Sequence, residues 1–204
     1  MSETNKWNQR YSESGYAYGT DPNDFLRESI HLLPKGGRVL CLAEGEGRNS
    51  VFLARHGFQV AAVDSSTVAM EKTQKLAQQH GVEVTTIVDD LAAFTFTPNQ
   101  YDAIISIFCH LPPALRKTVH QSIQSSLKDG GIFLLEGYTP KQLGHGTGGP
   151  PIAELLMNLK EIREELTPLT IIHGLELERN IQEGKLHTGV GAVVQLIAQK
   201  SRRD

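Results

Sequence analysis

The stretch that most constrains this chain is Gly37–Ser50, which reads GRVLCLAEGEGRNS. Its apolar run, Val39–Ala43, is long enough for a buried parallel strand. Gly45 and Gly47 then predict a tight turn, and Arg48-Asn49-Ser50 lead into an amphipathic helix. A strand, a glycine turn and a helix in this order predict a site for a nucleotide-sized ligand, because free backbone N–H groups and the helix N-terminus meet there.

Strand-like and helix-like runs alternate through the next hundred residues. The further strand-like runs are Phe58–Val63, Val82–Val88, Tyr101–Ile107 and Ile132–Glu136. This alternation predicts a parallel, doubly wound α/β sheet, in which ligands bind beyond the carboxyl ends of the strands. The segments expected at that edge are Ala43–Asn49, Asp64–Ser66, Asp89–Leu91 and Phe108–His110.

The two ends of the chain add to this sheet. Residues 3–20 resemble neither a strand nor a strong helix, yet they hold the only Trp and three of the five Tyr. We interpret residues 1–20 as an aromatic flap over a ligand, with plain surface packing as the alternative. The first clear helix is expected to start at Asp21-Pro22.

After the fifth strand, Gly137–Pro151 contains five glycines and three prolines. A connection this long is usually functional or disordered, so we expect a lid or substrate loop rather than a plain linker. A helix over Ile152–Leu166 should follow, and then an antiparallel hairpin formed by Leu169–Ile181 and Lys185–Ala198.

Length and composition set outer bounds. The 204 residues suit one domain, 1–204, and the net charge of −3 provides no basic footprint for nucleic acid. No apolar run reaches the roughly 18 residues of a membrane span, and no apolar leader opens the chain. We expect a cytoplasmic protein with two reduced, buried thiols, Cys41 and Cys109, and no metal site, since no cluster has metal-ligand spacing.

The charges around the glycine turn narrow the ligand. Glu44 and Glu46 would repel the pyrophosphate of a nicotinamide dinucleotide, and Ser50 replaces the third small residue of that fingerprint. S-adenosyl-L-methionine suits the turn better, because it has an amine and a sulfonium, and its carboxylate could bind Arg48 or backbone N–H groups. Asp64, at the end of the second strand, is placed to accept the ribose hydroxyls.

On these motifs the chain resembles the class I S-adenosylmethionine-dependent methyltransferases. The resemblance extends from VLCLAEGEGRNS through AVDSS, VDDL and IISIFCHLP to the final hairpin. The segments WNQRYSESGYAYGTDPNDFL and FLLEGYTPKQLGHGTGGP look like the small-molecule branch known as tellurite-resistance or thiopurine type. The resemblance implies a Rossmann-like, seven-stranded sheet, mostly parallel with an antiparallel last strand. It also implies that the aromatic flap closes over cofactor and substrate.

The first motif departs from the family at two positions. Cys41 stands in place of the usual acid, and Ala43 in place of the first glycine. Glu44 or Glu46 is the expected substitute partner of the cofactor's ammonium group. The residues expected to bind S-adenosyl-L-methionine, or its product S-adenosyl-L-homocysteine, are Tyr18, Ala43, Glu44, Gly45, Glu46, Gly47, Arg48, Asn49, Asp64, Ser65, Asp90, Leu91 and Ile107.

The expected function is methyl transfer to a small-molecule acceptor. Such a transfer needs alignment above all, and a soft nucleophile such as a thiol or a metalloid needs no strong base. His110 and Tyr138 are the candidate catalytic residues, and the sequence leaves open whether Arg179 and His187 face the site or solvent. The alternative is a non-catalytic protein that binds or senses S-adenosylmethionine.

Overall fold

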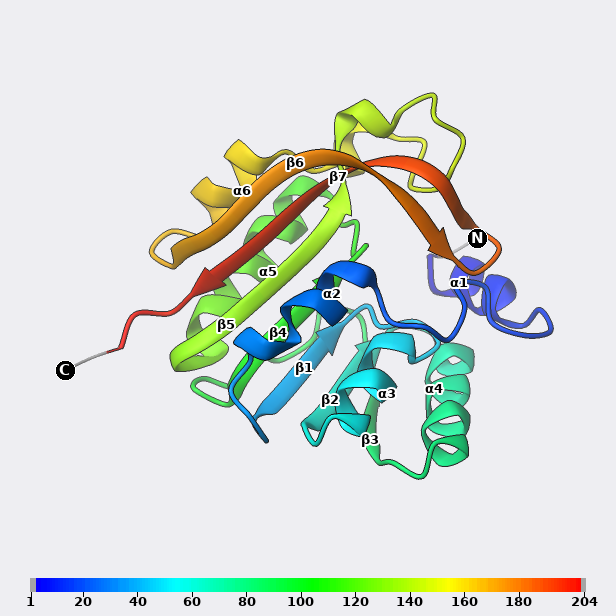
Figure 1. The fold of residues 1–204 in the computed structure, drawn as a ribbon, viewed down its shortest axis with the longest axis horizontal. Coiled ribbons are helices and arrows are strands. Elements are labelled where there is room, and N and C mark those ends of the chain that lie inside the picture. Colours follow the sequence, from blue (N-terminus) through cyan, green and yellow to red (C-terminus); the bar gives the residue numbers. More distant parts are fainter. Residues whose placement is uncertain (1–2, 203–204) are drawn as a thin grey trace.

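A seven-stranded sheet with helices on both faces organises the protein (Figure 1), described here over residues 3–202 by a computed structural model. The strand order is β3-β2-β1-β4-β5-β7-β6, and only β7 runs against its neighbours. This confirms the predicted fold. The strands are β1 (Arg38–Leu42), β2 (Gln59–Asp64), β3 (Val84–Val88), β4 (Tyr101–Ile107), β5 (Leu127–Tyr138), β6 (Thr170–Glu183) and β7 (His187–Gln199).

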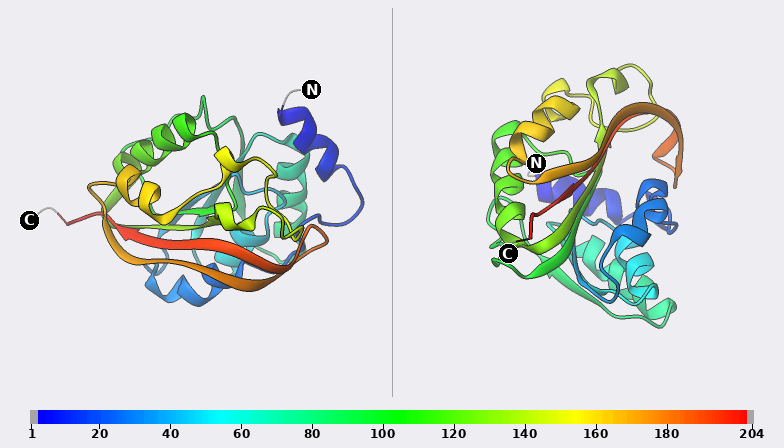
Figure 2. Two further views of the ribbon diagram at one scale, coloured as in Figure 1. Left: turned by 90° about the horizontal axis from the view of Figure 1, so that it is seen from above. Right: turned by 60° about the vertical axis from the view of Figure 1, so that its left-hand side comes forward.

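Burial on both faces explains why the central strands are continuously apolar. In β1, Val39 and Cys41 pack with Leu53 on one side of the sheet, whereas Leu40 and Leu42 pack on the other. Figure 2 shows the two helical layers. One layer consists of α2 (Asp24–Ser29), α3 (Arg48–Arg55) and α4 (Thr67–Gln79), and the opposite layer consists of α5 (Pro113–Ser126) and α6 (Leu159–Glu165).

The N-terminal segment and the last hairpin meet beyond the carboxyl ends of the strands. Helix α1 (Glu3–Tyr11) packs on α4, and the β6–β7 turn lies beside the chain that follows α1 (Figure 1). The Lys185 N–H donates a hydrogen bond to the Ala17 carbonyl over 3.0 Å. Two segments distant in sequence therefore cover the edge where a ligand is expected.

Three local expectations were wrong. Residues 3–11 form helix α1, which is held by packing of Tyr11 on α4 rather than by its own periodicity. The next helix starts at Asp24, because Asn23 caps it by accepting the Leu26 N–H. The helix expected over 152–166 is confined to α6, capped by Asn158, and preceded by one 3₁₀ turn.

Two expectations reach past the described residues. Residues 1–2 of the proposed flap and residues 203–204 of the proposed domain lie outside them. Within residues 3–202, no helix combines the length and the apolar character needed to cross a membrane.

A glycine pair tests how tightly the turn after β1 is packed. Gly47 has φ +95°, and a Cβ there would lie 2.9 Å from the Thr73 Cα, whereas Gly57 has φ +85° with open space around it. We expect Gly57→Ala to lower the free energy of unfolding by about 1–2 kcal/mol, the cost of the left-handed backbone alone. Gly47→Ala should cost measurably more, because it adds a steric overlap. Equal losses in urea titrations of the two variants would contradict the close α3–α4 contact.

Candidate active site

The turn after β1 is a strained backbone feature at the predicted ligand edge. Ala43 has φ +45° where a glycine would be relaxed, and Phe108, the first residue after β4, has φ +52°. Left-handed non-glycine residues cost energy and concentrate at functional sites. The two positions follow neighbouring parallel strands, so the strain marks one edge of the sheet.

Glu44 caps helix α3 from inside the turn. Its Oε1 accepts the N–H groups of Asn49 and Ser50, at 3.0 and 2.6 Å. Burial raises the pKa of Glu44 to about 7, although the Ser50 N–H lowers it in part. The carboxyl group therefore occupies two N–H groups at the N-terminus of the helix, where an anionic ligand would otherwise bind.

Glu46 joins the turn to the N-terminal segment. Its two oxygens accept the Ala17 N–H, at 2.6 Å, and the Lys72 ammonium, at 2.8 Å. Both acids expected as substitute partners of the cofactor's amine therefore have partners within the chain.

Arg48 and Asn49 connect the turn to other segments. Arg48 is buried and forms a 2.7 Å ion pair with Glu183 of β6, while its Nη1 is buried without a hydrogen-bond partner among residues 3–202. The Asn49 Oδ1 accepts the Asn23 N–H at 2.9 Å. The Arg48 Nη1 is thus a donor available to an anionic group.

Asp64 lies at the end of β2, as predicted, and is nearly buried. One carboxylate oxygen accepts the Gly45 N–H at 2.9 Å and the other accepts the Ser66 N–H at 2.8 Å. Burial raises its pKa, and these N–H groups lower it in part. Each oxygen keeps a second lone pair for a ligand. The half-buried Ser65 lies next to it in the chain.

The remaining predicted cofactor residues differ in exposure. Asp90 is exposed and accepts the Ala92 N–H, so its second oxygen is accessible from outside. Leu91 and Ile107 are buried and belong to the cores on opposite faces of the sheet. Their side chains therefore serve packing, although their backbone lies at the strand ends.

Four aromatic rings pack together between the N-terminal segment and the hairpin. Tyr18 accepts a hydrogen bond from Arg10 at 2.8 Å, and its ring centre is 4.5 Å from that of His187. The His187 ring is also 4.8 Å from Phe108 and 5.4 Å from Tyr138. This aromatic box, defined as Tyr18, Phe108, Tyr138 and His187, joins the N-terminal segment, the residue after β4, β5 and β7.

His110 was expected as a catalytic candidate, but both of its ring nitrogens are already engaged. Nδ1 bonds the Leu155 carbonyl at 2.9 Å, and Nε2 accepts the Tyr138 N–H at 3.3 Å. Burial lowers its pKa to about 4, despite the Leu155 carbonyl. Both nitrogens of His110 therefore have partners within the chain.

Tyr138 is fully buried, and its hydroxyl has no hydrogen-bond partner among the described residues. The loop expected to act as a lid covers it: Gly149 lies against the ring, and Gln142 fixes the loop by bonds to Thr147, Gly148 and Ala192. Burial raises the pKa of Tyr138, so the hydroxyl remains a proton donor.

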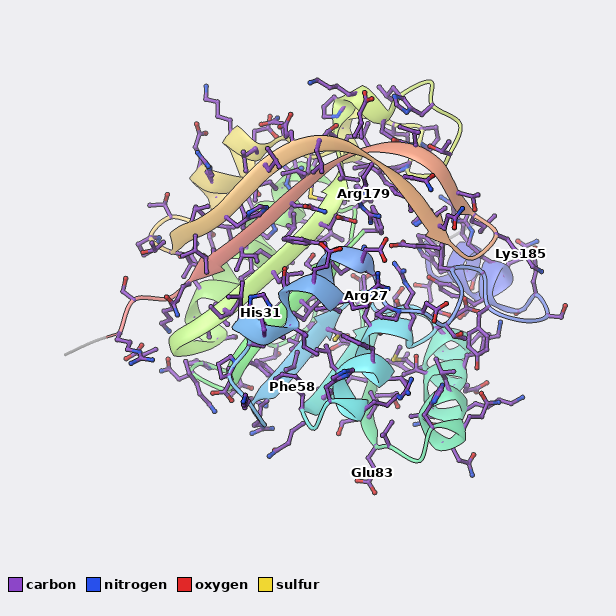
Figure 3. All side chains as sticks on the ribbon, in the orientation of Figure 1. Arg27, His31, Phe58, Glu83, Arg179 and Lys185 are labelled. Carbon is purple, nitrogen blue, oxygen red and sulfur yellow. The ribbon has the colours of Figure 1, made fainter. Side chains whose placement is uncertain are left out.

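A buried ionic network supports the box, and the sequence did not reveal it. Glu136 accepts hydrogen bonds from Asn23, Arg179 and Gln195. Glu183 accepts from Asn23 and Arg48. Figure 3 shows Arg179 lying between the hairpin and α2. In the sequence, Arg179 lies within the expected strand Leu169–Ile181, and Glu183 follows this strand in the expected turn.

The seven-stranded Rossmann-like fold is shared with a solved S-adenosylmethionine-dependent methyltransferase. Residues 39–131 match the family described as "Methyltransferase domain". Carboxy-S-adenosyl-L-methionine synthase from Psychrobacter sp. (strain PRwf-1) is 34% identical over 104 residues, which are 49% of this chain and 36% of that protein. The chain thus matches about a third of the length of this curated relative.

Solved structures agree with this fold. TehB from Haemophilus influenzae has a TM-score of 0.71 at 17% identity, covering 97% of this chain and 66% of that one. A S-adenosylmethionine-dependent methyltransferase from Methanosarcina mazei has a TM-score of 0.66 at 19% identity, covering 90% and 100% of the two chains. The family match thus covers residues 39–131, and the solved structures show that the fold of the whole chain is shared with methyltransferases.

The buried Glu44 predicts a pH-dependent stability. Since its folded-state pKa is raised from 4.5 to about 7, its contribution is fully present below pH 4.5 and is lost as the pH rises through 7. Relative to wild type, Glu44→Gln should gain on the order of 1–3 kcal/mol of unfolding free energy between pH 5 and pH 8. Denaturant titrations at both pH values measure this, with the exposed Glu83→Gln as control. A constant difference between wild type and Glu44→Gln would refute the raised pKa.

Proposed function

We propose that this protein is an S-adenosylmethionine-dependent methyltransferase that acts on a small molecule with a soft nucleophile, such as a thiol or a metalloid. The observation behind this proposal is the convergence of four strand ends, β1 to β4, on one edge with strained backbone at Ala43 and Phe108. The flap and the hairpin cover that edge. A fold alone does not determine an activity, so the site must support it.

The residues at this edge fit the cofactor. Asp64 retains lone pairs for the ribose hydroxyls, and Asp90 has an accessible oxygen for the adenine amino group. The unpartnered Arg48 Nη1 would bind the carboxylate of the methionine part. When bound, S-adenosylmethionine supplies a methyl group on a good leaving group.

The acceptor side is consistent with a small, soft nucleophile. The aromatic box is closed by the flap, by the loop at Gly148–Gly149 and by the hairpin, which limits the size of a substrate. The rings of the aromatic box, including the neutral phenol of Tyr138, would give a bound acceptor a polarisable surface to pack against. Tyr138 would act as a pocket wall and hydrogen-bond donor.

Isothermal titration with S-adenosylmethionine and S-adenosylhomocysteine tests the cofactor, and transfer of a labelled methyl group to thiols, metalloid anions, halides and phenols tests the activity. Micromolar binding and turnover with a member of this panel would support the proposal. Binding without turnover would favour the non-catalytic alternative. A folded protein that binds neither compound would contradict the assignment altogether.

Asp64→Ala tests the ribose contact. The loss of charge-assisted hydrogen bonds should weaken S-adenosylhomocysteine binding by about tenfold or more. Asp102→Ala is a matched control, because Asp102 also accepts a backbone N–H, that of Arg38, at the opposite end of the sheet. Equal affinities of the two folded variants in the titration would remove Asp64 from the site.

A further inference from the structure

A histidine–carboxylate pair, His187 and Glu183, faces the aromatic box from the hairpin. The His187 Nδ1 lies 3.5 Å from the Glu183 Oε2, and both side chains are nearly buried. Glu183 is itself fixed by Arg48, at 2.7 Å, and by Asn23, at 2.9 Å. A carboxylate held in this way orients the imidazole ring and fixes the proton on Nδ1.

Nε2 is the ring nitrogen left for a substrate. Among the described residues, no hydrogen bond engages it, in contrast to both nitrogens of His110. The ring is enclosed by Tyr18, Phe108 and Tyr138, and Phe108 is the first residue beyond β4. The His187 Nε2 therefore lies near the edge of the sheet at which methyl transfer is proposed.

The orphaned Tyr138 hydroxyl lies next to the same ring. Both the hydroxyl oxygen and the His187 Cδ2 come within 2.8 Å of one point, the position that a Cβ on Gly148 would take. A Cβ at that point would overlap both side chains, so the loop at Gly148 packs closely against the Tyr138 hydroxyl and the edge of the imidazole ring. A buried hydroxyl group without a hydrogen-bond partner destabilises the folded protein, unless a ligand supplies that partner.

We propose that His187 is the base that removes the proton of the methyl acceptor, that Glu183 positions its ring, and that the Tyr138 hydroxyl donates a hydrogen bond to the acceptor atom. This inference rests on the proposed function and deepens it. The proton of an acceptor such as a thiol moves to the His187 Nε2 as sulfur forms the bond to the methyl carbon. The carbon–sulfonium bond breaks with its electron pair on the departing S-adenosylhomocysteine, and His187 later returns the proton to water.

The charges around His187 are compatible with this role. Burial lowers its pKa and Glu183 raises it in part, while Arg48 and Arg10 disfavour the charged ring. Burial alone would raise the pKa of Glu183, but His187 and Arg48 outweigh it and lower that pKa to about 2. Tyr18, Tyr138 and His110 are the other titratable groups nearby. A neutral imidazole beside a permanent carboxylate can accept a proton.

His187→Gln keeps a donor toward Glu183 and removes the base. For an alkyl thiol that is protonated at the assay pH, we expect kcat/KM to fall by about 100-fold or more. For an aryl thiol that is already ionised, the loss should stay below about tenfold, since no proton has to be removed. Equal losses for the two thiols would overturn the proposal. His31→Gln, an exposed histidine on the opposite side of the fold (Figure 3), is the control.

An equilibrium measurement keeps the test independent of turnover. A chromophoric aryl thiol with a solution pKa slightly above the assay pH is added to the wild-type complex with S-adenosylhomocysteine. In the wild-type complex, the bound thiol should show thiolate absorbance at pH values below its solution pKa. In His187→Gln, the bound thiol should ionise only near its solution pKa. A bound thiol that stays protonated in wild type would refute His187 as its base.

A glycine pair locates the acceptor. Gly148→Ala would place a Cβ within 2.8 Å of both Tyr138 and His187 and so displace them, whereas Gly146→Ala has open space and also a positive φ. We expect the first to raise KM for the thiol at least tenfold with unchanged S-adenosylhomocysteine affinity, and the second to change neither. If both behave alike, the acceptor binds elsewhere. If wild type transfers no methyl group to any acceptor, the proposed function itself fails.

Discussion

Two buried carboxylates, Glu136 and Glu183, need guanidinium groups beside them, one buried (Arg48) and one partly buried (Arg179), and much of the active-site architecture follows from this. Glu136 is completely buried in β5, and Glu183 is nearly so at the end of β6. An unpaired buried carboxylate would be strongly destabilising, so Arg179 and Arg48 must come to them. Because these residues belong to α3, β5 and β6, their pairing brings distant segments to one place.

Asn23 extends the same network to the N-terminal segment. Its amide donates to both Glu136 and Glu183, while its own backbone N–H donates to Asn49 and its Oδ1 caps α2. One residue thus links the start of α2, the glycine turn, β5 and the hairpin. The position of His187 and of the aromatic box depends on this link, since Glu183 is bonded to both Asn23 and His187.

The fold was predictable because the relevant signals are local. The apolar runs, the glycine stops and the strand-end acids predicted the parallel part of the sheet, and β4 was predicted without error at Tyr101–Ile107. Helix α1 was missed because its stability comes from Tyr11 and Trp7 packing on other parts of the fold, which no periodicity reveals. The start of α2 was misplaced because Asp21-Pro22 resembles a cap as much as Asn23 does.

The candidate site was only partly predictable. The glycine turn and Asp64 follow from strand order, so their positions could be read from the chain. The side-chain contacts between distant segments could not be predicted, because they depend on the register between β5, β7 and β6. His110 looked catalytic from its place after β4, yet its nitrogens bond Leu155 and Tyr138, whereas His187 was left undecided and lies in the aromatic box.

A crystal structure of the complex with S-adenosylhomocysteine tests the central claim most directly, namely that one covered edge of the sheet binds both cofactor and acceptor. The account predicts the ribose on Asp64, the carboxylate of the ligand near the Arg48 Nη1, and the ligand sulfur directed toward Phe108 and His187. Density for the ligand at another surface, or a sulfur atom directed away from the aromatic box, would contradict it.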